Sequence, residues 1–356
     1  MVQNLDDVVD QLFTILTELN LNMDMKAYSN LTDKEKKDFQ KAEIKLNEVV
    51  LKNLIKLEKN HSKFFKDSEK RPTNQTREED RQSTMVNALQ YAVLQPNTHP
   101  NVVAQLIKMG TSEDCMMIEE LGHRTALHLS FVFNNQVLIP TIVDSLKEKL
   151  KNEGKSLAEI KSTVKEFVNI EMSSKHLKTR YNNATALSLL CAQQRGYDNR
   201  SSKVEDLFGA TEVEHLLMNG ASPNFKDNKG NTPLHQSVIK GRLVAQHTNE
   251  EIKKENLKKE PLKKQPLKDE SLYAYEATKP LLRILIKAGA DIEEKNNEGK
   301  TFYAELKPEH QEEVKKIDRM VKLTRDSGVS IANSNDLTYV SKHNSSKTKS
   351  KGCSIM

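Results

Sequence analysis

The sequence lacks tryptophan, and only 5% of its 356 residues are aromatic. It has three cysteines, Cys115, Cys191 and Cys353, and their spacing matches no metal site. Such sparse use of cysteine is typical of a protein in a reducing compartment. No apolar run approaches the roughly 20 residues of a transmembrane helix. The N-terminus also lacks a basic region followed by an apolar stretch, so we expect no secretory signal peptide.

Motifs that bind nucleotides or support catalysis are also missing. The phosphate-binding G-x-x-x-x-G-K, the dinucleotide-binding G-x-G-x-x-G, H-E-x-x-H, C-x-x-C and G-x-S-x-G do not occur. Lysine and arginine number 55 against 50 acidic residues, and the two signs are interspersed, so the net charge of +5 does not indicate a nucleic-acid partner. We therefore predict a protein that is not an enzyme, with no catalytic, cofactor-binding or metal-binding residues.

One short motif recurs along the chain. Gly230–His235 reads G-N-T-P-L-H, and Arg124–His128 reads R-T-A-L-H. Weaker copies stand at 87–92, 183–188 and 301–304. Apolar segments that end at a glycine also recur, as in Val213–Ala221 and Leu281–Ala290, and glycine suits the left-handed residue that follows a helix. Recurrence of both halves predicts a repeat protein built from helix pairs.

From about residue 84 to about 325 these motifs resemble those of the ankyrin-repeat family. The resemblance implies an all-α ankyrin-repeat solenoid of about five irregular repeats, which binds an unknown protein ligand on its surface. In that family the motif threonine begins the first helix of a repeat, and the histidine braces neighbouring repeats. The residues to which the resemblance gives these structural roles are Thr125, Thr185, Thr232 and Thr301 as caps, with His128 and His235 as braces.

The repeats are irregularly spaced. Equivalent positions are 38, 60, 47 and 69 residues apart, against about 33 in a regular ankyrin unit. We therefore predict insertions near 152–180, 193–210 and 241–276. In the first, Ser156 and Glu159 form a capping box that predicts an added helix to about Asn169. The last contains lysine- and proline-rich pentads, which favour an extended, solvated loop over a packed helix. Alternatively, it is a lysine-rich patch that touches a membrane or an acidic partner.

The two ends of the chain do not fit the repeat. Residues 1–70 carry a helical apolar stripe that includes Leu12 and Leu16, then a capping box at Thr32 and Glu35, then a second stripe. This second stripe consists of Phe39, Ile44, Leu46, Val49, Val50, Leu54 and Leu57. We predict an N-terminal helical hairpin that caps the first repeat, with a separate partner-binding module as the alternative. Residues 71–83 are predicted to be a linker, and Pro308 to open a C-terminal capping helix.

Residues 326–356 form a predicted flexible basic tail that ends in a C-a-a-X prenylation motif. Cys353 is the predicted lipid acceptor, followed by Ser354, Ile355 and Met356, and methionine in the last position indicates a farnesyl group. Three lysines, Lys347, Lys349 and Lys351, supply the basic second signal for an anionic membrane. The motif predicts a prenyltransferase as partner and a location at the cytoplasmic face of a membrane.

The combination of ankyrin motifs and a C-a-a-X tail resembles that of effectors which intracellular bacteria inject and the host prenylates. This resemblance implies a non-enzymatic protein-binding scaffold on a host membrane. Two alternatives remain open at this stage. The chain could be a eukaryote's own prenylated ankyrin scaffold, or an adaptor or enzyme whose active module lies in residues 1–70.

Overall fold

The computed structural model describes eleven segments of the chain. They are residues 4–19, 31–65, 72–79, 84–95, 98–118, 123–131, 135–172, 183–192, 209–256, 269–304 and 306–326. The lipidation motif and the three tail lysines lie outside these residues, as do most of the predicted insertion at 193–210 and residues 173–182.

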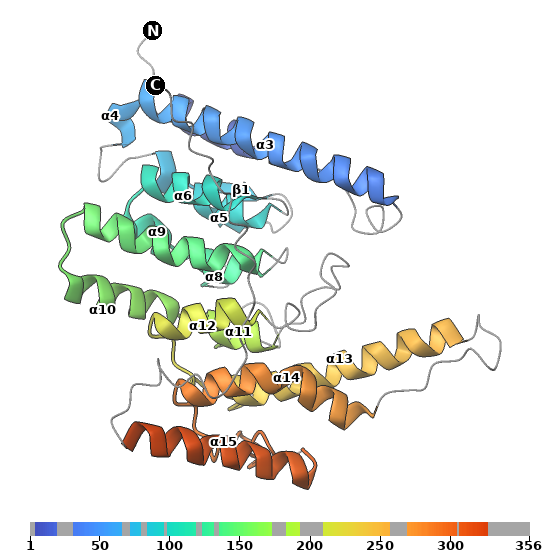
Figure 1. Ribbon diagram of the computed structural model, residues 1–356. Helices are drawn as coiled ribbons and strands as arrows, with labels where there is room; N and C mark the ends of the chain where they lie inside the picture. The colour runs from blue at the N-terminus through green and yellow to red at the C-terminus, as the bar shows by residue number, and fades with distance from the viewer. Residues whose placement is uncertain are drawn as a thin grey trace, which may run out of the picture.

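Four helix pairs stack to form the body of the molecule (Figure 1). The first helices of the pairs are α5 (Ala88–Leu94), α8 (Ala126–Leu129), α11 (Ala186–Ala192) and α13 (Pro233–Asn256). Their partners are α6 (Pro100–Met109), α9 (Ile139–Asn152), α12 (Ala210–Met218) and α14 (Glu270–Lys287). Each first helix contacts the next first helix, and each partner contacts the next partner. The fold is thus an all-α solenoid of two helical layers, as the ankyrin resemblance predicted.

The first helices start at the positions that the repeat motif marks. Asn87, in the weakest copy, accepts a 2.9 Å hydrogen bond from the Gln90 backbone, and its own N–H donates to the Gln90 side chain. This reciprocal capping satisfies two of the backbone groups that a helix end leaves without partners. Thr125, Thr185 and Thr232 stand directly before the first residues of α8, α11 and α13. A continuous apolar core from Val86 to Val321 then joins the pairs.

The N-terminal hairpin consists of α1 (Leu5–Thr17) and α3 (Asp33–Asn60), followed by the short α4 (Ser62–Phe65). The capping box between Thr32 and Glu35 is present and begins α3. A second apolar cluster joins the hairpin to the first pair. It includes Val8, Leu12, Leu16, Val50, Leu54, Ala88, Ala92, Val102 and Leu106. The hairpin therefore caps the solenoid, as predicted.

The predicted linker 71–83 is wrong for its described part. Residues 72–74 form a 3-10 turn, η1, and β1 (Arg77–Glu79) pairs antiparallel with β2 (Thr84–Val86). The buried Thr73 hydroxyl donates a 3.0 Å hydrogen bond to the carboxylate of Asp114, which lies in α7 (Ser112–Met116). The segment is therefore held against the first repeat rather than spanning a gap.

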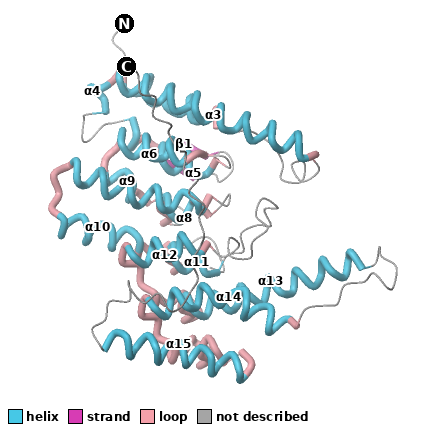
Figure 2. The backbone as a smooth tube through the Cα atoms, in the orientation of Figure 1, coloured by secondary structure: helices cyan, strands magenta, loops and turns pink. Residues whose placement is uncertain are grey.

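Of the two added helical elements, the sequence predicted one and missed the other. The helix α10 (Leu157–Val168) begins at the Ser156–Glu159 capping box and ends at Asn169, as predicted. The extended loop predicted for 241–276 is wrong for its described parts, because α13 continues to Asn256 and α14 begins at Glu270, while the proline-containing pentads at 258–267 lie outside the described residues. With 24 residues, α13 is about 36 Å long. Figure 2 shows the outer parts of α13 and α14 projecting from the stack as a helical arm.

The C-terminal cap is α15 (Pro308–Asp326), which starts at the proline predicted to open it. Val314 and Val321 are buried against α14. At the root of the arm, the Tyr275 and His310 rings stack with centroids 4.1 Å apart. Thr301 was predicted to cap a helix of a fifth repeat, and this is wrong, because it leads into a turn closed by Ala304 N–H donating to its carbonyl.

Candidate functional site

Two equivalent turns form the base of the site. The first finger, Asp227–Asn231, precedes α13, and the second finger, Asn296–Lys300, follows α14. In the first, Asp227 accepts 2.8 Å hydrogen bonds from the backbone N–H groups of Lys229 and Asn231. In the second, the Asn296 side-chain oxygen accepts from the N–H groups of Glu298 and Lys300 at 3.0 and 3.1 Å. Because the patterns agree, the second finger is a true structural copy of the first, although within the described residues a single long helix follows it.

Each finger needs a glycine at its fourth position. Gly230 and Gly299 have φ of +73° and +75°, a conformation in which other residues are strained. Their surroundings differ. A side chain on Gly230 would collide with Asn297 of the second finger, whereas Gly299 faces open space.

The fingers are held together by hydrogen bonds. Asn297 donates its backbone N–H to the Lys229 carbonyl at 3.0 Å and its side-chain amide to the Asn228 carbonyl at 3.1 Å. The Asn296 amide also donates to the Asn231 side chain at 3.1 Å. Consecutive fingers therefore form one hydrogen-bonded edge of the solenoid.

His235 connects α13 to both fingers. Its Nδ1 accepts from the Thr232 backbone N–H at 3.2 Å, so Nδ1 carries no proton and Nε2 does. Nε2 then donates to the Lys300 carbonyl at 3.0 Å. The ring is buried, and burial lowers its pKa because the charged form loses solvation. His235 thus braces two repeats in its neutral form, the role implied by the family resemblance.

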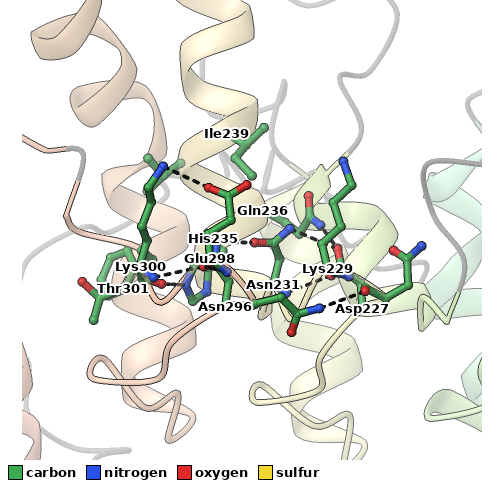
Figure 3. A pocket seen from close by; sticks show the side chains of 14 residues that line it. Asp227, Lys229, Asn231, His235, Gln236, Ile239, Asn296, Glu298, Lys300 and Thr301 are labelled. Carbon is green, nitrogen blue, oxygen red and sulfur yellow. Dashed lines mark hydrogen bonds and ion pairs between the residues drawn. The ribbon is translucent and has the colours of Figure 1, made fainter.

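A groove of about 440 Å³ lies between the fingers and the start of α13. Its lining consists of Asp227, Asn228, Lys229, Asn231, His235, Gln236, Val238, Ile239, Asn296, Asn297, Glu298, Lys300, Thr301 and Phe302. Figure 3 shows the Lys229 and Lys300 side chains rising from the two fingers on either side of the Glu298 carboxylate, with Ile239 above them. The volume falls in the range of about 300–1,000 Å³ typical of ligand sites.

The floor of the groove is polar, and its one buried charge, the Asp227 carboxylate, accepts hydrogen bonds from neighbouring groups of the protein. Asp227 is buried and accepts, besides the two backbone bonds, from the Gln236 side-chain amide. On the rim, the Lys300 amine lies 2.9 Å from the Glu298 carboxylate, and this hydrogen bond lowers the pKa of Glu298. Among the described residues, the Lys229 amine makes no ion pair. The groove therefore offers an open positive group beside a half-buried isoleucine.

Thr125, His128 and Thr185 occupy equivalent places in the stack, outside this groove. Thr125 donates its backbone N–H to His128 Nδ1 at 3.2 Å, repeating the Thr232–His235 contact. At the third copy Ser188 replaces the histidine, and its backbone N–H donates to the Thr185 hydroxyl at 3.3 Å. Thr301 does line the groove, next to the buried Phe302.

The motif search missed most of the groove. A comparison of the two fingers alone, D-N-K-G-N-T and N-N-E-G-K-T, would have found them, because both place Asp or Asn three residues before glycine and threonine two residues after it.

Neither cysteine in the described residues is prepared to act as a nucleophile. Cys115 and Cys191 are fully buried, and burial raises the pKa of both thiols, that of Cys191 to about 11. A thiol with such a raised pKa is a poor nucleophile and a poor metal ligand. No cluster of three or more His, Cys, Asp or Glu side chains in this part of the chain could hold a metal ion. Nor does any helix described here have both the length and the apolarity to cross a bilayer.

Comparisons with known proteins add little to this picture. No family model and no curated protein matches the sequence. Among solved structures, the chain is similar to the ankyrin repeat domain of Bcl-3, described as a unique member of the IkappaB protein family. The similarity covers 76% of this chain and 93% of the Bcl-3 domain, with 16% sequence identity and a TM-score of 0.29. Because that superposition is so loose, the fold assignment rests on the helix pairs and finger contacts described above.

Proposed function

We propose that this chain is a non-enzymatic ankyrin-type scaffold that binds a partner protein in the groove between the two fingers and α13. The observation that supports this most is the state of the groove itself. Its buried polar groups are satisfied by one another, while its rim keeps an open amine and an apolar side chain. Such a surface is ready to bind, and the two lining groups whose pKa is lowered, His235 and Glu298, are both engaged with Lys300.

We further propose that a farnesyl group on Cys353 anchors the scaffold to a cytoplasmic membrane leaflet. The support is the sequence Cys353–Met356 with basic residues before it. A single lipid chain binds membranes only marginally, so a second signal is needed. At about 1 kcal/mol per lysine near an anionic surface, Lys347, Lys349 and Lys351 add about 3 kcal/mol, or roughly 150-fold in affinity.

As to its biological setting, we propose that the chain is a bacterial effector that the host's prenyltransferase modifies. The support is the resemblance noted in the sequence, namely irregular, insertion-rich ankyrin motifs together with a C-a-a-X tail. A translocation assay from a bacterial secretion system tests this directly. Failure to enter the host cell would favour a eukaryotic scaffold.

The anchor is tested by intact-mass analysis of protein made in eukaryotic cells, with and without a farnesyltransferase inhibitor. We expect the mass of one isoprenoid, absent in Cys353→Ser and in inhibitor-treated cells but present in the control Ser354→Ala, which keeps the acceptor thiol. An unmodified Cys353 in untreated cells would refute the anchor and leave the binding function to be judged separately.

A further inference from the structure

We infer that the groove selects a partner segment in which a carboxylate side chain lies beside an aliphatic one. Lys229 would bind the carboxylate, and Ile239 would cover the aliphatic group. This inference rests on the proposed protein-binding function and specifies the chemistry of the partner.

The charged groups that a ligand can reach determine whether the groove prefers an acidic or a basic ligand. Four charged residues line the groove: Asp227, Lys229, Glu298 and Lys300. Asp227 is buried, and its carboxylate already accepts from four groups of its own repeat. The accessible rim therefore carries two ammonium groups and one carboxylate, a net charge of +1.

The pairing on the rim decides which lysine acts. Lys300 is engaged with Glu298 at 2.9 Å, whereas Lys229 forms no ion pair among the described residues. Lys229 is exposed and rises toward the opening of the groove (Figure 3). The Lys229 charge helps to lower the pKa of Glu298, but an incoming carboxylate would gain a charge-assisted hydrogen bond from Lys229 without breaking an ion pair. A basic ligand group would instead meet both ammonium groups.

The aliphatic half of the preference comes from α13. Ile239 is half-buried and lines the groove, and the neighbouring Val238 is 4% exposed. The polar floor offers a ligand little, because His235 and Gln236 already donate to Lys300 and Asp227. Burial of an apolar side chain on Ile239 is then the main favourable contact apart from Lys229.

The test is a selection from a library of random 12-residue peptides displayed on phage, with the immobilised full chain as bait. Binding of a recovered peptide is then measured by fluorescence polarisation to the native chain, to Lys229→Glu and to a matched control, Lys295→Glu. Lys295 is exposed in the adjoining segment but does not line the groove, so the control makes the same charge change nearby.

We expect recovered peptides to be enriched in Asp or Glu next to Leu, Ile, Val or Met. Lys229→Glu should weaken their binding about tenfold or more, as loss of a charge-assisted hydrogen bond predicts, while Lys295→Glu changes it less than about twofold. Enrichment of basic peptides, or binders insensitive to Lys229→Glu, would overturn this inference while leaving the scaffold function intact. Recovery of no binder by the folded chain would count against the scaffold function itself.

Discussion

The contact between the two fingers can be tested by placing the same substitution on either side of it. Gly230→Ala and Gly299→Ala introduce one methyl group at equivalent positions with nearly the same φ, +73° and +75°. Each should cost about 1–2 kcal/mol for placing alanine in the left-handed region. The second glycine is therefore a matched control for backbone strain.

Only Gly230→Ala should lower the free energy of unfolding by a further amount, through a steric clash. A Cβ there would lie 2.8 Å from the Asn297 backbone nitrogen and would also overlap the Asn297 side-chain oxygen. The second finger would have to move, weakening the two hydrogen bonds that Asn297 donates to Lys229 and Asn228. Each such bond contributes about 0.5–1.5 kcal/mol. We therefore expect a total of about 2–5 kcal/mol for Gly230→Ala, against about 1–2 kcal/mol for Gly299→Ala.

Equilibrium unfolding in urea measures both losses on the same chain. A third variant, Asn297→Ala, removes the side chain that a Cβ on Gly230 would strike, so the penalty of Gly230→Ala should shrink in that background. The reasoning would be refuted if both glycine variants lost the same free energy of unfolding, or if the Gly230→Ala penalty were independent of Asn297.

Three further predictions concern the stability of the stack. Burial lowers the pKa of His235, so the imidazole binds a proton more readily in the unfolded chain than in the folded one. The stability that the neutral His235 contributes is therefore complete above about pH 6.5 and is lost as the pH falls toward the folded-state pKa. His235→Gln should flatten that part of the pH profile, and an unchanged slope would count against the assignment. Leu285→Ala, at a fully buried position of α14, should cost about 2–5 kcal/mol in urea unfolding, and a loss below about 1 kcal/mol would show that the site is not core. Tyr275→Ala should cost about 3–5 kcal/mol, because the ring is 1% exposed and stacks on His310. The exposed neighbour Leu272→Ala is its control and should change stability by less than about 0.5 kcal/mol.

Local signals in the sequence predicted the helix starts well. Capping boxes at Thr32 and Ser156 and the proline at 308 each begin a helix in the structure. These signals work because the hydrogen bonds that cap a helix involve residues only three apart, which the sequence displays directly. The same holds for Asn87, although its copy of the repeat motif is weak.

The arm could not be predicted in this way. The segment after Gly241 is polar and charged, and a loop was predicted for all of 241–276 from proline-rich pentads at 258–267, which lie outside the described residues. Its helices are instead supported by each other and by α15, with Ile252 and Tyr275 buried and Tyr275 stacked on His310. Such pairing depends on residues far apart in the chain, which periodicity within one segment does not reveal.

Periodicity also overestimated the buried face of α3. Ile44 and Val49 belong to the predicted apolar stripe, yet they are 57% and 40% exposed. Val49 adjoins the fully buried Val50 and therefore lies off the narrow buried face, whereas the exposure of Ile44 follows from the length of the helix. The helix α3 has 28 residues, whereas the first pair, on which it packs, has helices of 7 and 10 residues. A pattern predicts which face of a helix is apolar but not where its neighbour ends.

The groove shows a similar division between what the sequence reveals and what it does not. The resemblance implied that His235 is structural, and its two hydrogen bonds fit that role. The open amine of Lys229 could not be foreseen, because it depends on Glu298 pairing with Lys300 rather than with Lys229. Glu298 and Lys300 belong to the same finger, whereas Lys229 stands on the other finger, 69 residues before Glu298 in the chain.

The claim that a partner protein binds this groove is tested most directly by site-specific photo-cross-linking in cells. A photoreactive amino acid replaces Asn228 on the rim of the groove or, as the control, Lys161 on the exposed surface of α10. The account predicts a discrete cross-linked protein from position 228 that is absent from position 161 and is lost in Lys229→Glu. Cross-links of equal yield from both positions, or none from position 228, would contradict it.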